Sequence, residues 1–223
     1  MARPKRFERS TDGFVVRYSI QLSYGRKLYL FIGQTDDNVN DNLTGVFTRM
    51  QFHKAVMEPA SVHGIVMKLA VSEAETAFQE EEVPVGAVLI SESGVVLAST
   101  HNQTISLSDP TAHAEILALR HAAKQIQNYR LLNTTLYVTV EPCIMCMGAI
   151  IHARVSRLVY GAGDSKWGAA GSLYDLSADK RLNHSLEVIA GVCEIECREI
   201  LQRFFRDRRS HPAGQEGSFL RKD

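Results

Sequence analysis

The pattern of hydrophobic and polar positions is strongest in the middle of the chain. Over residues 65–78, apolar residues recur at helical spacing with glutamates between them, which predicts a helix that ends near Glu81. Apolar runs at 83–90 and 95–99 follow, and the polar stretch at 91–94 between them predicts a tight turn. We therefore expect a helix followed by a β-hairpin.

Helices and strands alternate further along the chain. Asp109-Pro110 predicts the start of a helix that reaches about residue 127, because Ser108 or Asp109 suits the N-cap and Pro110 suits the first helical position. A shorter helix is expected from Pro142 to about residue 153. The remaining expected elements are strands at 136–140, 157–160 and 187–189 and a last helix that ends near 209. Strands that alternate with helices predict a layered α/β domain.

The two ends of the chain lack a comparable pattern. Residues 1–56 contain one candidate strand at 27–32 and no motif. We therefore expect residues 1–56 to be an N-terminal extension and residues 57–209 to form the organised domain. Residues 210–223 contain a proline and two glycines and no apolar pattern, so we expect them to be a disordered tail.

The start of the chain carries no targeting signal. Residues 1–10 lack the apolar core of a signal peptide, and no uninterrupted apolar run approaches the roughly 20 residues that cross a bilayer. We therefore expect a cytoplasmic protein without a membrane partner. Because the organised domain begins just beyond Met57 and Met67, translation from one of these methionines is a further hypothesis.

Two short clusters carry the chemistry. His113-Ala-Glu115 is followed further along the chain by Cys143-Ile-Met-Cys146. Zinc accepts imidazole nitrogen and thiolate sulfur, and a catalytic zinc site keeps three protein ligands and one exchangeable water. His113, Cys143 and Cys146 supply three such ligands, and no obvious fourth ligand lies near them in the sequence, so the pattern favours an open catalytic site. Glu115 is then placed to carry protons for the bound water.

The pairing of His-x-Glu with Pro-Cys-x-x-Cys is the known signature of zinc-dependent nucleobase deaminases, in which zinc-activated water attacks the base. The signature alone does not separate adenine from cytosine or guanine substrates. Three other interpretations stay open: chance packing or a structural zinc for the three ligands, a free-base or nucleoside deaminase acting on guanine or cytosine, and a catalytically silent RNA-binding or scaffold subunit. Glu115 argues against the silent subunit, because such a protein has no need of a proton carrier.

Further blocks of sequence surround the two clusters. They are Glu82-Val-Pro-Val-Gly-Ala-Val88, Asp109-Pro-Thr-Ala-His-Ala-Glu115, Asn128-Tyr-Arg-Leu131, Leu136-Tyr-Val-Thr139, Glu141-Pro-Cys143, Gly168-Ala-Ala-Gly-Ser-Leu173 and Phe204-Phe-Arg206. Through these blocks, residues 67–209 resemble the bacterial tRNA-specific adenosine deaminases. The resemblance implies a cytidine-deaminase-like three-layer α/β/α sandwich with a mixed central sheet and a homodimer with one Zn²⁺ per subunit. It also implies hydrolytic conversion of the wobble adenosine of an arginine tRNA to inosine.

The resemblance indicates which residues bind the anticodon stem-loop of the tRNA. The substrate-binding residues that it implies for this chain are Val85, Asn102, Ala114, Asp164, Lys166, Phe205, Arg208 and Arg209. Asn102 should contact the flipped nucleotide, and Asp164 and Lys166 should meet the neighbouring ribose and phosphate. The chain departs from the family at Gly163 and Trp167, which flank that pair. A large indole is not expected in a loop that approaches the substrate strand.

The charge of the chain supports an RNA contact only as a local patch. The sequence has 25 Lys and Arg residues and 25 Asp and Glu residues, so it is not an overall polybasic nucleic-acid binder. The last helix supplies a candidate patch. Its residues that share one face at helical spacing are Arg198, Gln202, Phe205 and Arg209. Phe205 could stack on an unpaired base, as aromatic side chains do in single-stranded RNA loops.

Overall fold

The computed structural model describes residues 15–21, 27–33 and 59–210, with side chains from residue 62 onward. The chain divides into two compact units, residues 1–54 and 55–223. No helix in the described part of the chain has an apolar stretch long enough to cross a membrane.

The described part of the first unit is a β-hairpin. β1 (Val15–Gln21) and β2 (Lys27–Gly33) pair antiparallel, with Val15 opposite Gly33. The strand expected at 27–32 is β2, whereas β1 was not predicted. The rest of the expected extension, and the expected disordered tail beyond Ser210, lie outside the described residues.

The second unit is built on a mixed five-stranded sheet in the order β4-β3-β5-β6-β7. Its strands are β3 (Gly86–Ser91), β4 (Val96–His101), β5 (Thr134–Val140), β6 (Arg157–Ala162) and β7 (Glu187–Ile189). β3 pairs antiparallel with both β4 and β5, and β5, β6 and β7 run parallel. The predicted hairpin is confirmed, because β3 and β4 are joined by a turn in which the Gly94 N–H donates to the Ser91 carbonyl at 2.9 Å.

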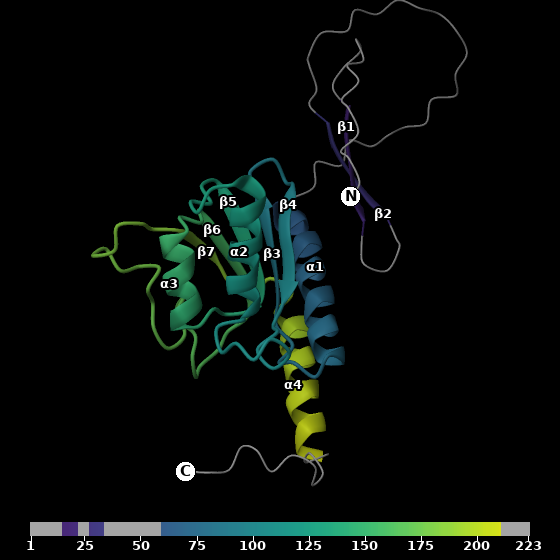
Figure 1. Ribbon diagram of the computed structural model, residues 1–223, viewed down its shortest axis with the longest axis vertical. Helices are drawn as coiled ribbons and strands as arrows, with labels where there is room; N and C mark the ends of the chain where they lie inside the picture. The colour runs from purple at the N-terminus through teal and green to yellow at the C-terminus, as the bar shows by residue number, and fades with distance from the viewer. Residues whose placement is uncertain (1–14, 22–26, 34–58, 211–223) are drawn as a thin grey trace, which may run out of the picture. The chain divides into compact units, whose positions relative to one another are not determined.

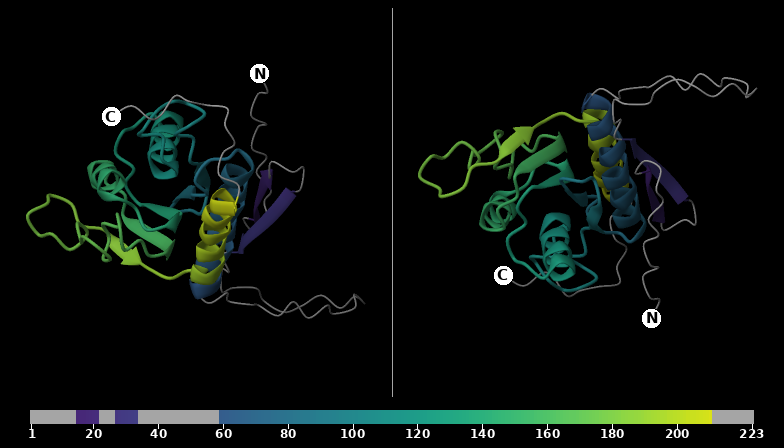
Figure 2. Two further views of the ribbon diagram at one scale, coloured as in Figure 1. Left: turned by 90° about the horizontal axis from the view of Figure 1, so that it is seen from below. Right: turned by 90° about the horizontal axis from the view of Figure 1, so that it is seen from above.

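Helices cover both faces of this sheet (Figures 1 and 2). The helices are α1 (Pro59–Gln79), α2 (Ala114–Ile126), α3 (Ile144–His152) and α4 (Glu194–Ser210). α1 and α4 lie side by side on one face, and α2 and α3 pack together on the other. The three-layer α/β/α sandwich with a mixed central sheet is therefore confirmed.

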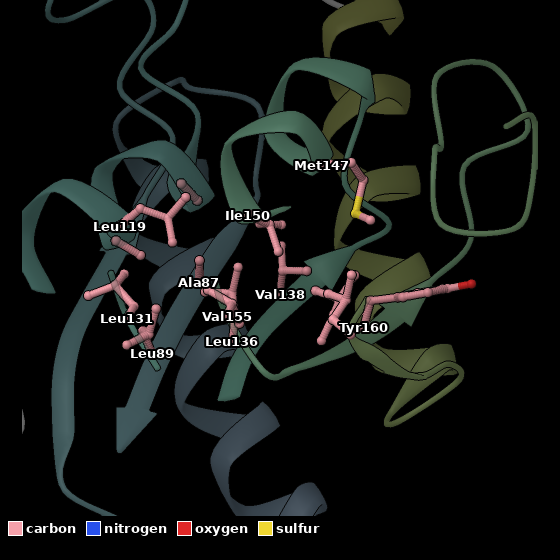
Figure 3. Packing of buried hydrophobic residues seen from close by; sticks show 14 of the residues in the cluster. Ala87, Leu89, Leu119, Leu131, Leu136, Val138, Met147, Ile150, Val155 and Tyr160 are labelled. Atoms are coloured by element: carbon pink, nitrogen blue, oxygen red, sulfur yellow. The ribbon is translucent and has the colours of Figure 1, made fainter. Parts of the chain in front are cut away.

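Burial on both faces explains the continuous apolar runs in the sequence. Side chains alternate between the two faces of a strand, so a strand between two helical layers is apolar at every position. In β3, Ala87 and Leu89 belong to the core cluster on the side of α2 and α3, whereas Val88 and Ile90 belong to the cluster on the side of α1 and α4. Figure 3 shows the first cluster, in which side chains of the sheet pack against those of α2 and α3.

The start of β3 lies very close to α1. A Cβ atom at Gly86 would lie 2.0 Å from the carbonyl oxygen of Ala70 and 2.6 Å from the backbone nitrogen of Ala74. Only glycine fits this contact. The segment just before β3, which carries Glu82 and Val85, is thereby fixed relative to the sheet.

Candidate metal centre and substrate cleft

The helix that carries the first cluster begins at Ala114 and not at Pro110 as predicted. The Oδ1 atom of Asp109 accepts hydrogen bonds from the backbone N–H of Thr111 at 2.8 Å and from its hydroxyl at 2.6 Å. The Asp109 carboxylate therefore closes a local turn, which short acidic side chains do readily. The prediction of Ser108 or Asp109 as N-cap was wrong, because the turn precedes the helix.

Asn102 fixes the start of α2 from the end of β4. Its Oδ1 atom accepts the N–H of Ala114 at 2.8 Å, and its own backbone N–H donates to the Val85 carbonyl at 3.0 Å. His113 is the N-cap residue of α2 and makes no side-chain capping bond, so its imidazole is not used to end the helix. Because the side-chain oxygen of Asn102 accepts a hydrogen bond from the start of α2, its side-chain NH₂ is the group that can donate to a substrate.

Three potential metal ligands meet where α2 and α3 begin. His113 and Cys143 are the N-cap residues of these helices, and Cys146 lies in the first turn of α3. The Nδ1 atom of His113 lies 3.8 Å from Cys143 Sγ and 3.5 Å from Cys146 Sγ, and all three atoms lie within 4.8 Å of one another. They form the one group of this kind among the described residues. The positive ends of two helices favour anionic ligands here.

The electrostatics of the three side chains favour a thiolate. Hydrogen bonds from Cys146 and then from His113 lower the pKa of Cys143 to about 4, against the opposing effect of burial. The hydrogen bond with Cys143 raises the pKa of His113, and the bond to Cys143 followed by burial raises the pKa of Cys146. Metal ligands must be deprotonated, and Cys143 is already disposed to be so.

Glu115 lies beside this group with its carboxylate buried and incompletely paired. The residue is only 3% exposed, and its Oε2 atom has no hydrogen-bond partner among the described residues. Burial raises the pKa of Glu115 above its ordinary value. A buried carboxylate with a spare oxygen and a raised pKa is suited to proton transfer, because it takes up a proton more readily than an exposed one.

A cleft of about 1580 Å³ joins this centre to α4. Most of the predicted site residues line it; they are Val85, Asn102, His113, Glu115, Cys143, Asp164, Lys166, Phe205 and Arg209. Cys146 lies behind the cleft as a buried member of the ligand group. Ala114 does not line the cleft, because its side chain is fully buried in the core. Its contribution to the site is the N–H that Asn102 binds.

Arg208 and Arg206 differ from the sequence-based assignment. Arg208 does not line the cleft: its guanidinium donates to the Glu81 carbonyl at 2.6 Å and lies 4.7 Å from the ring centre of Phe204, which joins α4 to the end of α1. Arg206 does line the cleft, together with Gln202 one helical turn earlier. The signal for Arg206 was present in the sequence, because residues four apart share a helix face.

Glu141 organises the loop at residues 163–172. Its carboxylate is 3% exposed and accepts hydrogen bonds from the backbone N–H groups of Asp164 at 3.0 Å, Ala170 at 2.9 Å and Ser172 at 3.0 Å, and from the Ser172 hydroxyl. Burial alone would raise the pKa of Glu141, and these hydrogen bonds together hold it below its ordinary value. Glu141 therefore stays ionised and fixes the loop that carries the predicted ribose and phosphate contacts.

Glu82 does the same for the segment that follows Asn102. It is fully buried and accepts hydrogen bonds from the N–H groups of Ile105 and Ser106, both at 2.8 Å, and from the Thr104 hydroxyl at 3.1 Å. Burial opposes ionisation, yet these bonds lower the pKa of Glu82. Neither glutamate was given a role on the basis of the sequence, although each stands at the start of a block that resembles the family.

Comparison with known proteins places this domain among deaminases. The model of the MafB19-like deaminase family matches residues 62–209, and the chain belongs to this family. Within that class, the chain is 53% identical over 144 residues to the tRNA-specific adenosine deaminase of Haemophilus influenzae, which covers 65% of this chain and 83% of the relative. It is 44% identical over 145 residues to the tRNA-specific adenosine deaminase of Bacillus subtilis, covering 65% and 89%. The resemblance inferred from the sequence blocks is confirmed.

Solved structures agree with these relatives. The chain superposes with a TM-score of 0.59 and 45% identity on a deaminase of A-to-I editing at the wobble position of transfer RNA, covering 60% of this chain and 97% of that one. It also superposes on the guanine deaminase of Nitrosomonas europaea with a TM-score of 0.51 and 23% identity, covering 77% and 98%. The second likeness concerns the fold alone, and the first confirms the cytidine-deaminase-like sandwich.

Proposed function

We propose that the protein hydrolytically deaminates the wobble adenosine of an arginine tRNA to inosine, with one zinc ion held by His113, Cys143 and Cys146. The observation that carries this proposal is a single cleft lined both by the metal-ligand group with Glu115 and by cationic side chains of α4. A deaminase of free bases needs the first set and has no use for the second. The relatives named tRNA-specific adenosine deaminase support the same substrate.

The three ligand atoms fit a zinc ion. Zinc–nitrogen bonds of about 2.1 Å and zinc–sulfur bonds of about 2.3 Å in a tetrahedral site place these ligands about 3.6 Å apart. His113 Nδ1 lies 3.5 Å from Cys146 Sγ and 3.8 Å from Cys143 Sγ. With three protein ligands in the group, one position is left for water. When bound, zinc lowers the pKa of that water to about 7 and makes it nucleophilic at neutral pH.

Glu115 supplies the proton transfers. Replacing the amino group at C6 of adenine with oxygen consumes one water and releases one ammonia, so protons must move from the attacking water to ring N1 and to the departing nitrogen. Glu115 accepts and returns these protons through its Oε2 atom, which accepts no hydrogen bond from any described residue. Its carboxylate ends the cycle in the state in which it began.

The cleft beside Glu115 suits a base that has left its stack. Val83 and Val85 form an apolar part of the cleft wall. The NH₂ group of Asn102 is available as a donor to a ring nitrogen or a ribose oxygen. A flipped base must be held by contacts of both kinds, because it loses its stacking and pairing in the loop. These residues therefore bind and orient the target nucleotide.

The charges of the cleft favour a polyanion. Among the described residues, Lys166, Arg206 and Arg209 form no ion pair, and all three line the cleft. The acidic residues Glu141 and Asp164 are instead occupied by backbone N–H groups. The unpaired positive charge is thus local, which reconciles RNA binding with a net charge of zero.

The homodimer that the resemblance implies and the cytoplasmic location expected from the sequence are part of the proposal. Relatives named tRNA-specific adenosine deaminase support that location. Sedimentation of the purified chain would give the number of subunits, and two is the expected number.

The direct test is inosine formation in the anticodon stem-loop of an arginine tRNA incubated with zinc-loaded protein. The matched control is the same stem-loop with guanosine at the wobble position, and guanine, cytosine and cytidine are run in parallel. Inosine at the wobble position alone is the expected result. Ammonia release from a small substrate without any inosine in the stem-loop would keep the deaminase chemistry and reject tRNA as substrate.

A further inference from the structure

Trp167 is an exposed indole on the wall of the cleft. It is 66% exposed and lines the same cleft as His113, Glu115 and Lys166. It is also the only tryptophan of the chain. Its ring makes no aromatic or cation–π contact with any described residue. Both its exposure and its lack of ring contacts argue against a role in packing, because an indole normally contributes to stability by being buried.

The backbone that carries Trp167 is firmly held. Asp164 Oδ1 accepts the N–H of Lys166 at 2.8 Å and that of Trp167 at 3.3 Å, and the Asp164 N–H is itself bound by Glu141 at 3.0 Å. The Gly168 N–H donates to the Asp164 carbonyl at 2.9 Å. These hydrogen bonds fix the backbone from which the indole projects.

The same loop is joined directly to the metal centre. Gly168 forms a β-bridge with Cys143, and the N–H of Ala169 donates to the Pro142 carbonyl at 2.9 Å. A Cβ atom at Gly168 would lie 2.4 Å from a carboxylate oxygen of Glu141, so no larger residue fits this junction. The position of the indole is thereby coupled to that of the metal ligands, which is what a substrate contact near the reacting base requires.

We propose that Trp167 is a stacking platform for the unpaired base next to the target adenosine. This inference rests on the proposed function. When the target base flips out of the loop, its neighbour loses a stacking partner, and an indole at the wall of the cleft can replace it. Every base has a π-face, so the contact selects for the presence and size of the neighbouring base and not for its hydrogen-bonding edge. Trp167 thus favours a loop in which the base beside the target adenosine is present.

The single tryptophan makes the contact directly observable. Intrinsic fluorescence of this chain reports on Trp167 alone, and stacking of a base on the indole is expected to quench it. The Glu115→Gln variant, which keeps the wall of the cleft, is titrated with the anticodon stem-loop so that no product forms. An abasic nucleotide is then placed at each loop position beside the target adenosine in turn.

The expected result has three parts. The intact stem-loop quenches the fluorescence, and one of the two abasic stem-loops does not. That abasic substitution weakens binding by about 5- to 150-fold, the range expected for loss of one base–aromatic stack. In the otherwise wild-type enzyme, Trp167→Ala raises KM by a similar factor with little change in kcat. In this variant the abasic substitution no longer weakens binding. Trp167→Phe restores most of the affinity.

A matched control is Tyr129→Ala, which removes an aromatic side chain of similar exposure, 68%, that does not line the cleft. It should leave KM and the abasic penalty unchanged. An undiminished abasic penalty in Trp167→Ala, or an unquenched indole with bound RNA, would overturn the inference. Quenching that depends on protein concentration without RNA would overturn it too, since it would place the indole against a second copy of the chain. Failure of the wild-type protein to form inosine in the same stem-loop would instead reject the proposed function.

Discussion

Buried glutamates act in opposite ways in two regions: the loops held by Glu82 and Glu141, here called the rim, and the metal centre with Glu115, here called the floor. On the rim, the buried carboxylates of Glu82 and Glu141 accept several hydrogen bonds each, mostly from backbone N–H groups, and their pKa values are lowered. On the floor, the equally buried Glu115 has an oxygen without any partner in the described part of the chain, and its pKa is raised.

The difference shows which buried carboxylates hold the structure and which take part in chemistry. A buried charge is tolerated when hydrogen bonds replace its hydration, and it then fixes the groups that donate to it. A carboxylate left incompletely paired costs stability, and its persistence indicates a partner that the protein alone does not provide. For Glu115 we propose that this partner is the substrate together with the attacking water.

The largest expected effect comes from removing the metal. His113→Ala should lose the zinc ion and all measurable turnover, because two thiolates alone leave the site without its third ligand. The rim should be unaffected, since its hydrogen bonds do not involve His113. Elemental analysis measures the zinc, and the fluorescence of Trp167 without RNA, unchanged from wild type, checks the rim. A variant that keeps one zinc per chain would contradict the ligand assignment.

The next effect concerns the rim itself. Glu141→Gln places an NH₂ group where backbone N–H groups now find an acceptor, so the free energy of unfolding should fall by about 2 kcal/mol. Hydrogen exchange at the amides of Asp164, Ala170 and Ser172 should accelerate. Denaturant unfolding measures the first and mass spectrometry the second. Glu92→Gln, at an exposed glutamate of the hairpin turn, is the control and should change neither. Equal exchange rates in Glu141→Gln and wild type would mean that the carboxylate does not hold the loop.

The same comparison between paired and unpaired groups applies to two arginines of α4, Arg208 and Arg209. Arg209→Ala should weaken stem-loop binding about tenfold and reduce the slope of log affinity against log salt by about 1, because one phosphate contact is lost. Arg208→Ala should leave that slope unchanged and lower the melting temperature, since this guanidinium is bound to Glu81 and stacked on Phe204. Binding titrations at several salt concentrations separate the two. A reduced slope in Arg208→Ala alone would reverse the assignment.

The smallest expected effect lies away from the cleft. His101 bonds Glu73 and Glu80, each at 3.0 Å, and the bond to Glu73, against the opposing effect of burial, raises the pKa of His101 above 6.5. A raised pKa means that this contribution is complete below pH 6.5 and is lost as pH rises through the pKa of the folded state. His101→Gln should therefore cost less than about 1 kcal/mol near pH 6 and nothing near pH 9. Melting curves of both proteins across this range test the sign; a cost that grows with pH would refute it.

Short-range relations were predictable from the sequence and long-range ones were not. His113 with Glu115, and Cys143 with Cys146, are close neighbours in the chain, so local geometry sets their arrangement. The start of α2 was predicted wrongly because its first N–H is bound by Asn102, 12 residues earlier and just after β4. Glu141 likewise reaches donors 23 to 31 residues ahead.

In the fold, too, local features were predictable from the sequence and long-range ones were not. The strands expected at 136–140, 157–160 and 187–189 are confirmed, and the apolar runs of the first two reflect burial on two faces. Their order in the sheet was not predicted, because periodicity carries no information on which strands pair. The hydrogen bond from Arg208 to the carbonyl of Glu81, 127 residues earlier in the chain, was likewise not predictable from the sequence.

The most direct test of this account is to measure zinc content, thermal stability and wobble inosine on one preparation each of wild type and Glu115→Gln. We expect one zinc per chain in both proteins, a melting temperature in Glu115→Gln equal to or above that of wild type, and inosine formation slower by about 10³-fold or more. Loss of zinc from Glu115→Gln would make Glu115 a ligand, and near-normal inosine formation would remove it from the chemistry; either result would contradict the central claim.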